Sequence, residues 1–130
     1  MSEVSFTTEV LEGVSVVVAP PEIDITNADG FRVTLLEASA SANGVLVVDL
    51  SGTDFCDSMG LNVLVREHER AEAAGGAVFL AAPGEAVQRI FAVTGIDRLL
   101  RTAPSLDAAL RDAAAVRASA DVGRLDLERA

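Results

Sequence analysis

Short apolar stretches rich in valine open the chain, and this pattern is typical of β-strands. Residues 5–11 and 14–19 are separated only by Glu12-Gly13, so they predict two strands of an antiparallel hairpin with a tight turn. Pro20-Pro21 ends the second strand, because proline has no N–H to donate to a neighbouring strand. We therefore expect residues 22–27 to form a loop that leads into a helix.

The spacing of apolar residues then changes to one helical turn. This predicts a helix with Thr26 or Asn27 as its N-cap and Asn43-Gly44 at its end. The inward face of this helix consists of Phe31, Leu35, Ala38 and Ala42. The following residues 45–50 are apolar at nearly every position, which predicts a central strand that is covered on both faces.

Helical and strand patterns continue to alternate in the second half of the chain. A second helix is predicted to start at Asp57 and to end at Gly75-Gly76, and a strand follows at residues 77–82. A third helix is predicted to begin at Pro83-Gly84 and to end at Gly95. Residues 98–102 predict a short edge strand, and a last helix follows with Ser105 as its N-cap. The inward faces predicted for these helices are Leu61, Leu64, Val65 and His68; Val87, Ile90, Phe91 and Thr94; and Leu106, Ala109, Leu110 and Ala113.

This alternation predicts an α/β fold: a single domain with a small mixed sheet that starts with an antiparallel hairpin and packs against four or so α-helices. The length of 130 residues suits one hydrophobic core. Beyond Val116 the apolar pattern fades. We therefore assign residues 1–116 to the domain and expect residues 117–130 to form a C-terminal tail that is frayed or weakly helical.

Charge narrows the kinds of partner that the protein can have. The net charge of -10 disfavours nucleic acid and anionic membranes. Nearly all of it lies in residues 1–60, where ten acids accompany one base; this half would either attract a basic partner surface or simply keep the protein soluble. The lone Cys56 cannot form an internal disulfide, and the sequence shows neither a signal peptide nor a membrane span, so we expect a cytoplasmic protein.

Candidate chemistry is concentrated where the central strand leads into the second helix. Asp57 has the residue type and position of an N-cap, which makes Ser58 the first helical residue, with its hydroxyl facing solvent. The helix dipole would favour a phosphoryl group at Ser58. That group would add roughly -1.5 to -2 charges beside Asp57, Asp54 and Asp24, and a partner that had accepted the neutral serine would be released. These residues therefore predict a phosphorylation switch.

The residues from Asp57 to Leu61 read D-S-M-G-L and follow an apolar strand. This resembles the D-S-x-G-L signature of the STAS-domain anti-sigma factor antagonists. Two further stretches resemble family patterns: P-E-I-D, ending at Asp24, and T-G-I-D-R-L-L, starting at Thr94 and followed by Ser105-Leu106. The resemblance covers about residues 5–115.

The resemblance implies a protein that binds an anti-sigma factor while Ser58 is unphosphorylated and thereby frees a sigma factor for transcription. It also implies that the anti-sigma factor is the serine kinase and that a PP2C-type phosphatase resets Ser58. Asp24 and Asp57 carry over as acidic neighbours of the phosphorylation site, together with Met59, Gly60 and Leu61. Met59 replaces a residue that is commonly small in the family, and proline replaces the glycine before Glu22.

Enzyme readings are not supported by the residues. Ser58 and the single histidine, His68, lie ten positions apart on one helix, which is roughly 15 Å, so they cannot form a catalytic pair. Nothing predicts a metal site or a cofactor, and we interpret Cys56 as a small buried residue and His68 as a hydrogen-bonded core histidine. A constitutive STAS scaffold in a larger assembly, such as a lipid-transport complex, stays open as the alternative function. A homodimer through the hairpin edge also stays open.

Overall fold

The computed structural model describes residues 6–41 and 44–129 of the chain. Five strands form the main sheet in the order β1-β2-β4-β6-β7, and two very short strands form a separate pair, β3-β5. The strands are β1 Thr7–Leu11, β2 Val14–Val18, β3 Glu22–Ile23, β4 Val45–Asp49, β5 Phe55–Cys56, β6 Ala77–Ala81 and β7 Arg101–Ala103. The helices are α1 Ala28–Ser41, α2 Ser58–Ala73, α3 Glu85–Thr94 and α4 Leu106–Arg129, with a 3-10 turn, η1, at Ile96–Arg98.

The main sheet is mixed, as the sequence predicts. β1 is antiparallel to β2, whereas β2, β4, β6 and β7 are all parallel. Glu12 and Gly13 both have positive φ angles, 54° and 80°, which is the backbone of a tight hairpin turn. The predicted strand start at Ser5 lies outside the described residues.

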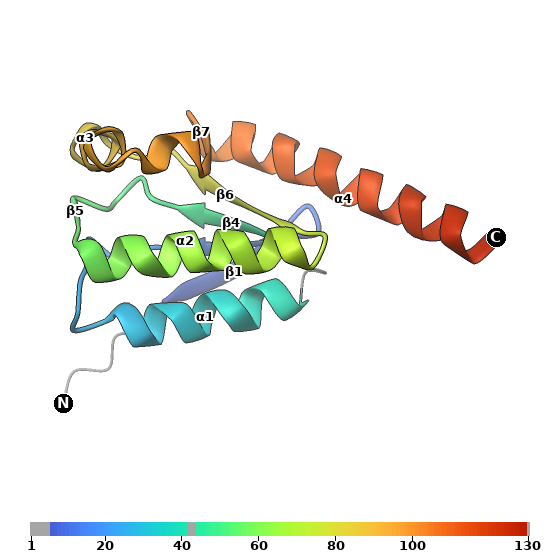
Figure 1. The fold of residues 1–130 in the computed structure, drawn as a ribbon, viewed down its shortest axis with the longest axis horizontal. Coiled ribbons are helices and arrows are strands. Elements are labelled where there is room, and N and C mark those ends of the chain that lie inside the picture. Colours follow the sequence, from blue (N-terminus) through green and yellow to red (C-terminus); the bar gives the residue numbers. More distant parts are fainter. Residues whose placement is uncertain (1–5, 42–43, 130) are drawn as a thin grey trace.

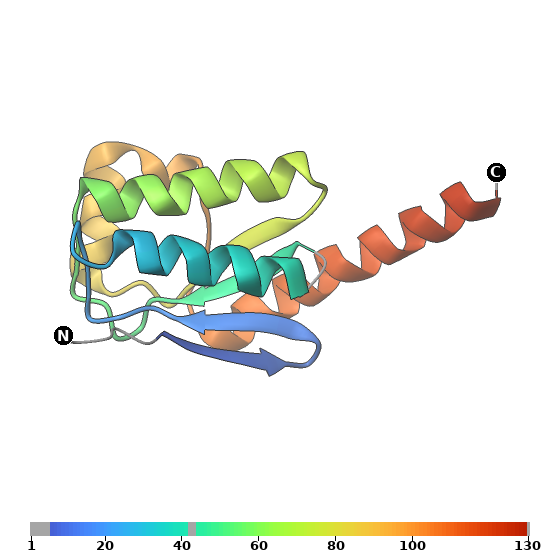
Figure 2. The same ribbon diagram turned by 90° about the horizontal axis from the view of Figure 1, so that it is seen from below.

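The helices cover both faces of the sheet (Figures 1 and 2). α1 and α2 lie on one face and α4 lies on the other, so the side chains of β4 alternate between two apolar clusters. Leu46 and Val48 face α1 and α2, whereas Val45 and Val47 face α4. The predicted central strand is therefore confirmed.

The first helix confirms its predicted face and begins directly after Asn27, but without the side-chain bond of an N-cap. Phe31, Leu35 and Ala38 are buried, and Ala42 and Asn43 lie outside the described residues. Asn27 precedes α1, yet its side chain accepts from Asp24 N at 3.0 Å and donates to the Glu22 carbonyl at 2.7 Å. Neither Thr26 nor Asn27 caps the helix with its side chain within the described residues, because both side chains bond back into the preceding loop.

The ends of the other helices agree with the sequence in most respects. Gly95 ends α3 with a φ of 79°, and the Ser105 hydroxyl accepts from Ala108 N at the start of α4. Val87 and Phe91 are buried, whereas Thr94 is exposed and its hydroxyl donates to the Ile90 carbonyl, so its predicted place on the inward face is wrong.

The last helix is longer than the apolar pattern that predicts it. α4 continues past Val116 to Arg129, and its far part extends beyond the sheet in Figures 1 and 2. Arg117 donates a hydrogen bond from Nη1 to the carbonyl of Gly13 and so connects α4 to the hairpin turn. The division of the chain at residue 116 stays a prediction.

The predicted loop at residues 22–27 contains the short strand β3, and the connection between β4 and α2 contains the short strand β5. Glu22 pairs with Phe55 and Ile23 with Cys56, in parallel. Backbone bonds extend the pair on both sides: Asp54 N donates to the Pro21 carbonyl at 2.7 Å, and Asp57 N donates to the Ile23 carbonyl at 3.0 Å. The loop after β2 and the loop after β4 are therefore joined along their backbones.

Candidate functional site

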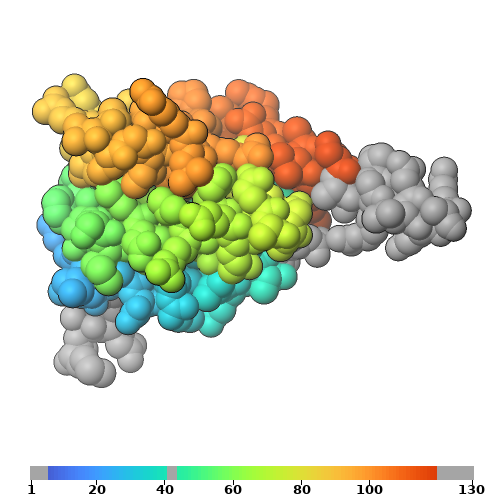
Figure 3. Space-filling model, viewed as in Figure 1, coloured from blue at the N-terminus to red at the C-terminus, as the bar shows by residue number. Residues whose placement is uncertain are grey.

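The predicted site residues lie at the carboxyl edge of the main sheet. The chain leaves β2 towards Asp24 and leaves β4 towards Ser58, and because β2 and β4 are neighbouring parallel strands, both loops emerge side by side. The β3-β5 pair then holds the loops together. In Figure 3 the green start of α2 reaches the surface between the blue start of α1 and the yellow and orange segment of α3.

Asp57 is the N-cap of α2 and also ties the helix to the neighbouring loop. One carboxylate oxygen, Oδ1, accepts from Gly60 N at 3.0 Å, which confirms the predicted cap. The other, Oδ2, accepts from Ile25 N at 3.2 Å. A single carboxylate therefore fixes the start of α2 relative to the segment that carries Asp24.

Ser58 is the first residue of α2 and is exposed. Its hydroxyl forms no hydrogen bond with the part of the chain that the structure describes. A helix N-terminus presents backbone N–H groups without partners and a partial positive charge, which favours a phosphoryl group. The position therefore combines access with a local electrostatic preference for phosphate.

Asp24 lies in the adjoining loop and is partly exposed. Its Oδ1 accepts from both the backbone N–H and the hydroxyl of Thr26. These bonds, the hydroxyl bond most of all, lower the pKa of Asp24 below its usual value of 3.8. Asp24 therefore carries its negative charge at neutral pH, in the loop that Asp57 holds.

Gly60 and Leu61 support the site from beneath, since both are buried. A Cβ at Gly60 would lie 2.7 Å from Cys56 Sγ and 2.7 Å from Ile23 Cγ2. Only glycine lets the first turn of α2 approach β3 and β5 this closely. The packing of these two residues thus fixes how far Ser58 stands from β3 and β5. Met59, the residue after Ser58, is exposed.

Three exposed apolar side chains come from the segments around Ser58. Ile25, Phe55 and Met59 are 72%, 46% and 44% exposed, in the loop after β3, in β5 and in the first turn of α2. We call these three residues the apolar rim. Met59 is among the predicted site residues, whereas Ile25 and Phe55 are not; the sequence signal for these two is an apolar side chain inside an otherwise polar segment.

The remaining candidates are structural. Cys56 is buried, and burial raises the pKa of its thiol to about 12, with a smaller contribution from Asp57, so it is an inert core residue as predicted. His68 is buried too, but its Nδ1 has no hydrogen-bond partner among the described residues, and the closest carboxylate oxygen, of Glu72, is 4.0 Å away. The prediction of a hydrogen-bonded histidine is therefore wrong for this nitrogen.

The described residues contain neither a helix that could span a membrane nor a cluster of metal-ligating side chains. In residues 6–41 and 44–129, no helix is both long and apolar enough to cross a bilayer. In the same part of the chain, no group of three or more histidine, cysteine, aspartate or glutamate side chains is arranged to hold a metal ion.

Known proteins resemble this chain in sequence and in fold. The family model of the STAS domain matches residues 5–109. A protein of Thermotoga neapolitana named as an anti-sigma factor antagonist is 28% identical over 109 residues, which are 82% of this chain and 96% of that protein. The crystal structure of an anti-sigma factor antagonist from Mycobacterium paratuberculosis is 32% identical, with a TM-score of 0.71 over 84% of this chain and 92% of that one.

A more distant structural match bears on the fold alone. It is the Bacillus cell fate determinant SpoIIAA in its phosphorylated form, at 21% identity and a TM-score of 0.62 over 82% of this chain and 98% of that one. The mixed sheet with its opening antiparallel hairpin and covering helices is thus an arrangement that this chain shares with solved structures.

Proposed function

Because the chain belongs to the STAS domain family, we propose that it is an anti-sigma factor antagonist whose binding is switched by phosphorylation of Ser58. In the unphosphorylated form it binds a cognate anti-sigma factor and frees a sigma factor for transcription. The observation that carries this proposal is the exposed Ser58 hydroxyl at the start of α2, with no bond to the described chain. Relatives named as antagonists support it.

The surface around Ser58 has the properties of a docking site. The apolar rim of Ile25, Phe55 and Met59 offers side chains that gain by leaving water. Asp24 and Asp57 add negative charge beside it, and both are held in place by backbone hydrogen bonds. The partner surface that fits is apolar at its centre and basic at its margin.

Phosphorylation would act on this surface through charge. A phosphoryl group on Ser58 adds roughly -1.5 to -2 charges to an already acidic pair of loops. The β3-β5 pair and Asp57 join the two loops, which opposes a movement that would relieve the repulsion. A partner that had bound the neutral hydroxyl would lose affinity through repulsion and through the desolvation of the phosphate.

The rest of the proposed cycle follows from the same site. The anti-sigma factor would act as the serine kinase, a PP2C-type phosphatase would remove the phosphate, and the antagonist itself would need no catalytic group or cofactor. With such partners the protein would act in the cytoplasm. A Ser–His hydrolase is not favoured, because Ser58 is exposed at the first turn of α2 and His68 is buried about 15 Å further along the same helix.

Mass spectrometry and binding of Ser58 variants test the proposal. Incubation with ATP, Mg²⁺ and candidate anti-sigma kinases is expected to add one phosphoryl group that maps to Ser58. Ser58→Ala should keep affinity for the cognate anti-sigma factor, whereas Ser58→Glu should lower it by at least about 30-fold, the equivalent of about 2 kcal/mol. Ser119→Glu is the matched control, because Ser119 is an exposed serine on α4, away from the site.

The alternative function predicts a different result in the same experiment. A constitutive scaffold, for example a subunit of a lipid-transport complex, would bind its partner equally well with Ser58, Ala or Glu at this position. The absence of any kinase-dependent phosphorylation, together with equal binding of all three variants, would favour the scaffold and contradict the switch.

A further inference from the structure

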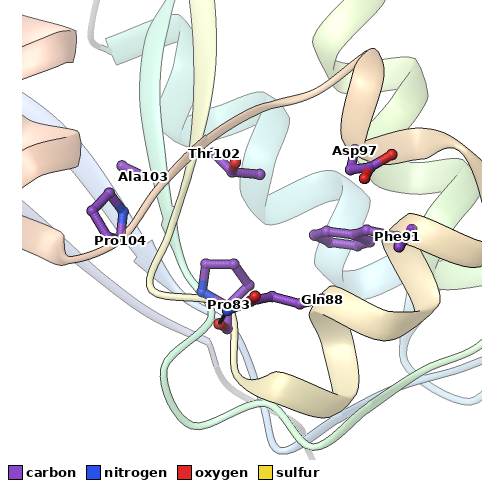
Figure 4. A pocket seen from close by; sticks show the side chains of 8 residues that line it. Pro83, Gln88, Phe91, Asp97, Thr102, Ala103 and Pro104 are labelled. Atoms are coloured by element: carbon purple, nitrogen blue, oxygen red, sulfur yellow. Dashed lines mark hydrogen bonds between the residues drawn. The ribbon is translucent and has the colours of Figure 1, made fainter.

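A recess opens at the same edge of the sheet as Ser58. It has a volume of about 500 Å³ and lies between α3, η1 and the end of β7, bounded by Pro83 and Pro104 (Figure 4). Pro83 follows β6 and Pro104 follows β7, so the recess lies at the carboxyl ends of these parallel strands. We call it the α3 pocket.

The α3 pocket is close to the proposed docking surface. β4, which leads to Ser58, is the direct neighbour of β6 in the sheet, and β7 follows β6. One to two strand spacings, roughly 5–10 Å, therefore separate the point where the chain leaves β4 from the mouth of the pocket. α3 also packs against β5, which contributes Phe55 to the apolar rim.

The polar atoms that line the α3 pocket are mostly acceptors. Gln88 donates from Nε2 to the Pro83 carbonyl at 2.7 Å, which leaves its Oε1 free to accept. Asp97 and Thr102 line the same pocket as Gln88 (Figure 4). Within the described ranges of the chain, neither the Asp97 carboxylate nor Gln88 Oε1 has a hydrogen-bond or ion-pair partner.

The remaining lining is apolar. Phe91 and Ala103 are buried, and Pro83 and Pro104 line the pocket with them. A ligand that fits must combine an apolar stem with a head rich in donors and positive in charge. An arginine side chain has this composition, since its guanidinium group carries five N–H donors, a fixed positive charge and no acceptor.

We propose that the α3 pocket binds an arginine side chain of the protein that docks on the Ser58 surface. The guanidinium group bonds to the Asp97 carboxylate and to Gln88 Oε1, and the methylene stem lies against Phe91. An anionic ligand is disfavoured by Asp97 and by the net charge of -10. The source of the arginine rests on the proposed function, whereas the chemistry of the pocket does not.

The test uses a probe that is independent of any anti-sigma factor. The full chain, labelled with ¹⁵N, is titrated with the blocked tripeptide acetyl-Gly-Arg-Gly-amide, and the amide shifts of residues around the pocket are followed by NMR. We expect a saturable change at Gln88, Asp97 and Thr102. The same tripeptide with citrulline, which has the shape of arginine without its charge, should bind at least about fivefold more weakly.

Two variants separate the pocket from general charge effects. Asp97→Asn keeps the shape of the side chain, and because Asp97 is exposed, the fold is expected to be retained and is checked in the same spectra. It should weaken the arginine tripeptide by roughly tenfold. Glu9→Gln, an equal change of charge at the opposite edge of the sheet, should leave binding unchanged.

The outcomes distinguish this inference from the proposed function. Any one of three results would overturn the arginine pocket, even if an anti-sigma factor binds at Ser58. These results are the absence of a saturable shift, equal binding of the arginine and citrulline peptides, and unchanged binding of the arginine peptide by the Asp97→Asn variant. Ser58→Glu should not alter binding of the tripeptide. The protein could also bind the tripeptide in the α3 pocket but bind none of the anti-sigma factors tested. That result would support the arginine pocket and contradict only the proposed function.

Discussion

Replacing Gly60 by alanine tests whether the close approach of α2 to β3 and β5 is essential. The new Cβ would lie 2.7 Å from Cys56 Sγ, 2.7 Å from Ile23 Cγ2 and 3.0 Å from the Ile23 carbonyl oxygen. Two of these neighbours, the Ile23 methyl and backbone, belong to a buried residue of a paired strand and cannot rotate away.

The magnitude follows from two opposing effects. Overpacking a well-filled core costs about 1–3 kcal/mol, whereas alanine in place of glycine stabilises a helix by up to about 1 kcal/mol. The gain is smaller than this in the first turn, where Gly60 lies. We therefore expect Gly60→Ala to lower the free energy of unfolding by about 1–2 kcal/mol, which is a fall in Tm of roughly 3–8 °C for a domain of this size.

The assay is urea unfolding followed by circular dichroism, with Gly52→Ala as the matched control. Gly52 is exposed and a Cβ there would meet no atom within 4 Å, so its replacement should change stability by less than about 0.5 kcal/mol. Cys56→Ala in the Gly60→Ala background removes one of the clashing atoms. It should restore part of the lost stability, seen as a coupling energy of at least about 0.5 kcal/mol.

A Gly60→Ala protein as stable as Gly52→Ala would refute this reasoning. It would mean that the start of α2 moves outward freely, and the height of Ser58 would then not be fixed by packing. Additive effects of the Gly60 and Cys56 substitutions would contradict the close contact between these two residues in particular.

Two further predictions concern ionisable groups of the site. The pKa of the Cys56 thiol is raised from 9.0 to about 12, so this thiol should resist iodoacetamide in the folded protein at about pH 9 and react once urea unfolds the chain. The free energy of unfolding should also fall from pH 9 to about 12, because only the unfolded thiol ionises in this range. The Cys56→Ala variant should lack this fall. The lowered pKa of Asp24, measured by NMR of its carboxyl carbon, should rise towards 3.8 in the Thr26→Val variant. The stability that Asp24 contributes is present above pH 3.8 and is lost as the pH falls through the folded pKa. An unchanged pKa in the variant would exclude the Thr26 hydroxyl as the cause.

The parts of the fold that the sequence predicted are those with a local signal. The hairpin has its turn pair, Glu12 and Gly13, between two valine-rich runs, and β4 is apolar on both faces. Asp57 was recognised as an N-cap because the bond it accepts, from Gly60 N, spans three residues. Such features need only a few neighbouring residues to be specified.

The missed features depend on residues far apart in the chain. β3 and β5 have two residues each, too few for a periodic pattern, and they exist because Ile23 and Cys56 pair across the loops. The second bond of Asp57, to Ile25 N, joins residues that are 32 positions apart. Asn27 occupies the predicted N-cap position, where its carbonyl accepts from Phe31 N, but its side chain bonds backwards, to Asp24 and Glu22, instead of forwards into α1.

The pairing of β3 with β5 has a consequence for when the site exists during folding. We expect residues 22–25 and 54–59 to come together once β2 and β4 have paired, since each segment follows one of these strands. A nascent or unfolded chain contains the D-S-M-G-L sequence but lacks the Asp24 loop beside it. A short peptide with this sequence is likewise an incomplete substitute for the protein. A kinase that recognises both the Asp24 loop and the D-S-M-G-L segment would therefore phosphorylate only folded protein. Phosphorylated Ser58 would then be found only in molecules that had folded.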